Sequence, residues 1–180
     1  MPKRALANTL RGLLWIIVIA GVVAVVLAVA NWLPSLAHRD FARKYGSIEE
    51  AKRSLGLERV AVPAYFPAGI SWPPSLVLAQ KSPFEAVVME FRKPETEETA
   101  LIVIQCSAHA SCAQFERIRM SEVKEETEYR LKGRVALLQV GMCNNVSCSR
   151  ISWQDLDHHF TVVLMSSPFE IIRIAESMIH

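Results

Sequence analysis

Four cysteines have the clearest chemistry in this chain, and they form two close pairs. Cys106 lies near Cys112, and Cys143 lies near Cys148. An even number of clustered cysteines is typical of disulfide bonds in an oxidising compartment. The alternative is a metal site formed by both pairs and His109, but both spacings are wider than in most zinc sites. We therefore expect disulfides at all four positions, with their connectivity open, and no metal.

Asp155, Asp157, His158 and His159 form a second group of chemically capable residues. Carboxylates and imidazoles this close together could bind a divalent cation or titrate near neutral pH. The same polar run is also typical of a solvent-exposed hairpin turn, which is the interpretation we favour. The sequence has no serine-nucleophile motif, phosphate-binding glycine loop or H-E-x-x-H zinc helix. We therefore expect no enzymatic activity and no cofactor.

Three aromatic residues, Tyr65, Phe66 and Trp72, lie close together in a segment rich in proline. They could line an apolar groove for a peptide or a lipid. The alternative is that their rings pack into the core or form part of a lid.

The charge balance argues against nucleic acid as a partner. The 180 residues include 20 basic and 18 acidic side chains, which gives a net charge of +2. Binding to nucleic acid through phosphate neutralisation needs a much larger basic excess. The length suits one domain with a substantial core.

Residues 13–33 form an uncharged apolar run with the length of a membrane-spanning helix, since roughly 20 helical residues cross a bilayer. A cleaved signal peptide is the alternative, but the run is long for one and ends without a clean cleavage site. Gly21, Ala24 and Ala28 would lie near one helical face, where a partner helix could pack. We expect a retained span through the lipid bilayer.

The predicted span divides the chain into four parts. Residues 1–12 are a basic tail, 34–56 are a juxtamembrane connector with a short helix, and 57–180 are an α+β domain. The paired cysteines favour the oxidising side for the large domain. We expect a single-pass protein of the inner membrane, with a cytoplasmic N-terminus and a periplasmic or extracellular C-terminal domain.

Two short helices are predicted at the ends of this domain. The first begins after Ser47, with Glu50 completing a capping box, and ends at Gly56. The second begins with Ser167 and proline at the next position, with Glu170 in a second capping box. Its predicted buried stripe is Phe169, Ile172, Ala175, Ser177 and Met178.

About six strands are predicted between the helices, from alternating or continuous apolar runs. They cover residues 76–80, 84–92, 100–106, 129–141, 151–154 and 160–165. Residues 107–128 are charged and predict a flexible connection. The expected fold class is α+β, with an N-terminal transmembrane helix and one curved antiparallel sheet that packs against the short terminal helices.

Four short motifs carry a resemblance to a known family: VPAYFPAG at 62–69, GRVALLQV at 133–140, Trp153, and SPFEIIRIAESM at 167–178. Together they resemble the small extracytoplasmic domain of unknown function that follows the single span of bacterial anti-sigma-factor-like and sporulation-related proteins. The resemblance covers residues 57–178 and implies a regulatory or sensory domain without known catalysis. The four cysteines are not part of that pattern. Only twelve residues precede the predicted span, so we expect any signal to pass through a partner.

The sequence as a whole predicts a non-catalytic regulatory or accessory protein of the bacterial envelope, which binds a partner that is itself a membrane protein. The alternative is a module that binds a lipid or another hydrophobic ligand on the concave face of its sheet.

Overall fold

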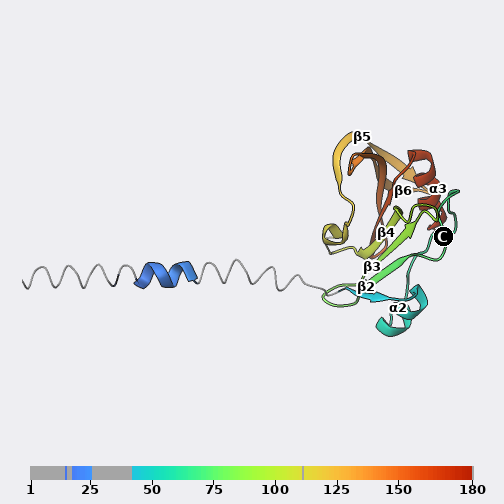
Figure 1. Cartoon of the computed structure of the whole chain (residues 1–180). Coiled ribbons are helices and arrows are strands. Elements are labelled where there is room, and N and C mark those ends of the chain that lie inside the picture. Colours follow the sequence, from blue (N-terminus) through green and yellow to red (C-terminus); the bar gives the residue numbers. More distant parts are fainter. Residues whose placement is uncertain (1–14, 16–17, 26–41, 111, 180) are drawn as a thin grey trace, which may run out of the picture. The chain divides into compact units, whose positions relative to one another are not determined.

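The computed structural model describes residues 15, 18–25, 42–110 and 112–179 (Figure 1). The structure divides into two units, and the larger one begins at Ala42. Among the described residues no helix is long and apolar enough to cross a membrane. The prediction of a transmembrane helix at residues 13–33 is therefore not supported by the part of the chain that the structure describes. Gly21 and Ala24 are helical and exposed, whereas Ala28 lies outside the described residues.

The larger unit is mostly an antiparallel sheet of eight strands, in the order β1-β2-β3-β4-β8-β7-β6-β5. The predicted α+β class with about six strands is therefore wrong. The strands are β1 Arg43–Tyr45, β2 Leu76–Gln80, β3 Ala86–Arg92, β4 Thr99–Ser107, β5 Met120–Leu131, β6 Arg134–Cys143, β7 Val146–Asp155 and β8 His158–Leu164. The few helices of this unit are α2 Ile48–Leu55, the short 3-10 helix η1 Cys112–Phe115 and α3 Pro168–Ser177.

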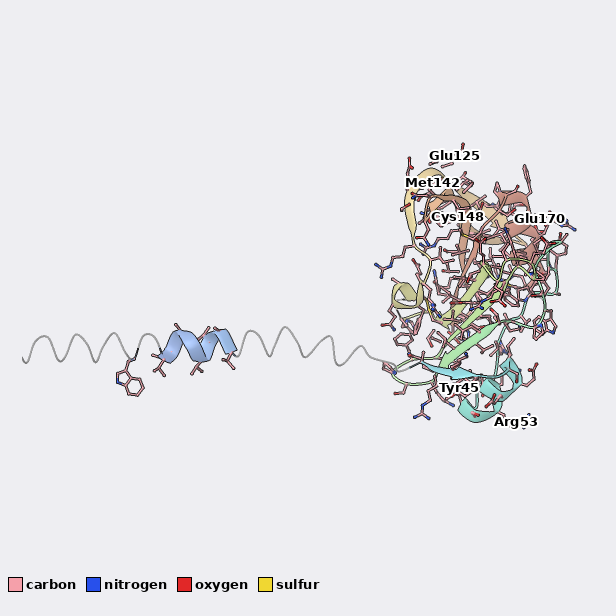
Figure 2. All side chains as sticks on the ribbon, in the orientation of Figure 1. Tyr45, Arg53, Glu125, Met142, Cys148 and Glu170 are labelled. Carbon is pink, nitrogen blue, oxygen red and sulfur yellow. A yellow bond between two sulfur atoms is a disulfide. The ribbon has the colours of Figure 1, made fainter. Side chains whose placement is uncertain are left out.

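The prediction missed β1 and β5 because both are edge strands. Most side chains of β5 are exposed, so its sequence lacks the apolar alternation that marks a half-buried strand. Charged side chains such as Glu125 follow this strand instead (Figure 2). Charges on an edge strand oppose pairing with another chain. The predicted single strand 129–141 is in fact the end of β5, a turn at Lys132 and Gly133, and most of β6.

One face of the sheet, here called the helix face, carries the larger core. Its apolar side chains pack with those of α2 and α3, including Ile171 and Ile174, which are fully buried. Both helices begin after the predicted serines, since Ser47 and Ser167 accept hydrogen bonds from the first-turn amides. The predicted stripe of α3 is only partly right, because Phe169 is 76% exposed.

The opposite face of the sheet is covered by residues 112–119, here called the strap. The disulfide between Cys106 and Cys112 ties the strap to β4. Glu116 forms an ion pair with Arg150 on β7, and Arg117 forms one with the buried carboxylate of Glu90 on β3. A disulfide and two ion pairs therefore join the strap to β3, β4 and β7.

Candidate functional site

The disulfide predictions are confirmed at all four cysteines. Cys106 pairs with Cys112, with a Cα–Cα distance of 6.2 Å. Cys143 pairs with Cys148 at 5.7 Å and closes the hairpin of β6 and β7. The thiolates that a zinc site would need are thus used in disulfides. Within the described parts of the chain, no group of three or more His, Cys, Asp or Glu residues is arranged to hold a metal ion.

Two adjoining hollows open at one end of the helix face. The larger has a volume of about 570 Å³ and the smaller about 310 Å³. They share Glu58, Arg59, Leu156 and His158, so they form one elongated depression, here called the His158 groove. The larger volume lies within the range of roughly 300–1,000 Å³ that is typical of ligand sites.

Apolar side chains form the floor of the larger hollow. Phe160 stacks on Trp153 with ring centroids 5.1 Å apart and an interplanar angle of 11°. Val60, Val62 and Met178 complete the apolar lining. The core of the helix face adjoins this lining, since Phe160 and Met178 belong to both. An apolar group of a ligand would therefore sit directly over Phe160.

A buried glutamine positions one wall of the groove. Gln105 on β4 is 3% exposed, and its Nε2 donates a hydrogen bond of 2.8 Å to the carbonyl of Arg59. Its Oε1 accepts one of 2.9 Å from the amide of Ala61. The side-chain amide thus pairs with the backbone of an irregular segment as another strand would. This pairing fixes the backbone of Arg59 at the edge of the groove.

The rim of the groove carries charges of both signs. Arg134 and Asp155 form an ion pair of 2.9 Å. Three other cations at the rim have no carboxylate within 4.0 Å among the described residues, and three acids there have no cation within that distance. These cations are Lys52, Arg59 and Lys81, and these acids are Glu58, Glu85 and Asp157. The rim therefore has charges free to pair with a bound molecule.

His158 lies between two residues whose types occur in serine hydrolases. It is the cross-strand neighbour of Ser107 on β4 and of Asp155 on β7. However, the Ser107 hydroxyl donates to the carbonyl of Glu85 at 3.5 Å, and the Asp155 carboxylate pairs with Arg134. No hydrogen bond joins His158 to either residue among the described side chains. The contact between nucleophile and base that such catalysis needs is missing from this arrangement.

Leu156 occupies the tip of the hairpin between β7 and β8. It is 70% exposed and has a φ of 52°, in the left-handed region. Glycine and asparagine adopt this conformation far more readily than leucine does. Lys132 and Asn144 have similar φ values in the other two tight hairpin turns. The Lys132 ammonium donates to the carbonyl of Ile179, a kind of hydrogen bond that the apolar side chain of Leu156 cannot form.

The cluster at 155–159 is split between the two faces of the sheet. Asp155, Asp157 and His158 line the His158 groove, whereas His159 points to the strap face beside Arg150 and Glu116. Burial and the positive charge of Arg150 lower the pKa of His159, while Glu116 opposes this shift. The four residues therefore do not form one site.

The predicted aromatic groove residues lie elsewhere on the domain. The Tyr65 hydroxyl donates to Glu170 at 2.7 Å, which raises the pKa of Tyr65, and Arg173 lies 4.0 Å above its ring. Phe66 packs against both Trp72 and Phe91, at 5.7 and 5.1 Å between ring centroids. None of these rings lines the His158 groove.

Comparisons of the chain with protein-family models, with curated proteins and with solved structures gave no significant match. The resemblance to the extracytoplasmic domain of anti-sigma-factor-like proteins therefore stays a prediction. Arg59, Gln105 and Leu156 were not predicted as site residues. For Leu156 a signal existed, because an apolar residue stands between two aspartates in a tight turn.

Proposed function

We propose that residues 42–180 form a non-catalytic binding domain of the bacterial envelope, which contacts a partner protein through the His158 groove. The observation that carries this proposal is the groove itself, with an apolar floor at Phe160 and unpaired charges of both signs at its rim. A few polar groups around an apolar pocket are typical of binding sites.

The compartment is inferred from the two disulfides. Disulfides persist in oxidising environments such as the periplasm or the cell exterior. The motif resemblance supports a regulatory or accessory role in the same compartment. The partner is then another protein of the envelope, and a membrane protein with an exposed extracytoplasmic segment fits this description.

A lipid or another hydrophobic ligand is the second candidate, favoured by the apolar floor. Two features weigh against it. The core fills most of the helix face, which leaves little room for a long acyl chain. The rim also carries free acids beside free cations, such as Glu58 beside Arg59, which suit a polypeptide better than a simple lipid anion.

Photo-crosslinking in intact cells tests this proposal. We would place a benzophenone amino acid at Glu58, an exposed rim position, and as a matched control at Glu125, an exposed acid on β5. Irradiation should give a distinct protein adduct from position 58 and not from position 125. Adding Arg59→Ala should reduce the adduct at least fivefold. Equal adducts from both positions, or none from position 58, would refute the proposal.

A further inference from the structure

The position of Leu156 is the most unexpected feature of the groove. The residue lies where the two hollows meet, and its side chain is mostly exposed to solvent. Its left-handed backbone conformation disfavours leucine, so glycine or asparagine at this position would give a more stable fold. Residues in unfavourable backbone conformations cluster at sites of function. An exposed leucine here is therefore better explained by binding than by folding.

The two hollows differ in their free charges. At the larger hollow, Lys52 and Arg59 outnumber Glu58 once the pair of Arg134 with Asp155 is set aside. At the smaller hollow, the acids Glu58, Glu85 and Asp157 outnumber Arg59 and Lys81. The groove is thus more basic at one end and more acidic at the other, with Leu156 between them.

We infer that the groove binds an extended polypeptide segment with an acidic side chain, a central apolar side chain and a basic side chain, in that spatial order. The acidic side chain faces Lys52, the basic one faces Glu85 and Asp157, and the apolar one packs between Leu156 and Phe160. This inference rests on the proposed function and specifies the chemistry of the partner. Charges of both signs in one groove disfavour a polyanion and favour a segment with both charges.

A peptide-display library selected on the full-length chain tests the inference. The enriched peptides should share one acidic, one apolar and one basic position. Their affinity should fall at least tenfold with Leu156→Gly, although this variant should unfold at a higher temperature than the wild type. Asn144→Gly, in the hairpin turn between β6 and β7, is the matched control and should leave the affinity unchanged.

Three outcomes would overturn the inference. They are no enrichment of any peptide, enrichment only of peptides with charges of one sign, and selected peptides that bind the Leu156→Gly variant as tightly as they bind the wild type. A co-purified lipid that selected peptides cannot displace, detected by native mass spectrometry, would assign the groove to a lipid instead. If the adduct from position 58 forms while the peptide test fails, the proposed function stands without this inference. If both tests fail, both are wrong.

Discussion

Neighbouring residues in a strand serve different surfaces, and the two adjacent histidines of β8 illustrate this. His158 lies in the groove on the helix face, and His159 lies beside the ion pair of Glu116 with Arg150 on the strap face. Successive side chains of a strand point to opposite faces. The residues at 155–159 are close in the sequence but do not share one face of the sheet, because His158 and His159 are successive residues of a strand.

The lowered pKa of His159 predicts a pH dependence of stability. Between that pKa and the unfolded value of about 6.5, the unfolded chain binds more protons than the native one. The free energy of unfolding should therefore rise with pH through this window, and His159 should add no further change above it. His159→Gln should reduce the loss of melting temperature between pH 7.5 and pH 5.

His158→Gln is the control for this prediction, because it replaces a histidine on the other face. It should keep the loss of melting temperature seen in the wild type. Differential scanning calorimetry at both pH values would measure the effect. A His159→Gln variant with an undiminished loss would contradict the assignment of this pH dependence to His159.

At the scale of elements, β5 depends on one glycine of β6. A Cβ on Gly141 would lie 1.9 Å from the backbone oxygen of Glu122, so no side chain fits there. The register of β5 shifts on both sides of this contact, between Met120 and Glu122 and between Val123 and Glu125. The irregular edge strand therefore comes close to β6 where β6 has no side chain.

Gly141→Ala should destabilise the protein by about 2 kcal/mol or more, because the backbone of β5 must move away. Urea denaturation would measure this change. Gly46→Ala is a suitable control, since its Cβ would meet only the flexible carboxylate of Glu50 at 3.0 Å. If both variants unfold at the same urea concentration, the close approach is not required for stability.

At the scale of the whole domain, both faces of the sheet are covered by different means. The helix face is covered by the larger apolar core with α2 and α3. On the other face the strap packs Phe115 and Ile118 on a smaller apolar cluster, and a disulfide and two ion pairs also hold it. Short covalent loops stabilise a fold mainly by restricting the unfolded chain. In the folded state the disulfide also ties Cys112 of the strap to Cys106 on β4, so the strap depends on oxidation more than the helices do.

Cys106→Ala with Cys112→Ala should lower the free energy of unfolding by about 2 kcal/mol. Replacement of Cys143 and Cys148 should cost a similar amount, because the two loops have similar lengths. Hydrogen exchange would separate the two variants, since amides of the strap should exchange faster only in the first. Unchanged exchange in the strap would show that the ion pairs hold it without the disulfide.

The sequence by itself determined the features that depend on local chemistry. Serine caps and the glycine stop marked the helices of residues 42–180, the spacing of the cysteines indicated disulfides, and apolar runs marked the buried strands. These signals lie within a few residues of one another. Most of edge strand β5 was not predicted, because its side chains mostly face solvent and its sequence therefore lacks apolar alternation.

Only the tertiary structure decided the site. The His158 groove joins Arg59 from an irregular segment, Gln105 from β4 and Leu156 from a distant hairpin. The pairing of β4 with β8 places Gln105 opposite Phe160, and the register of β7 with β8 places Asp155 opposite His158. Strand register depends on contacts between residues far apart in the chain, so no local pattern could have assembled this groove.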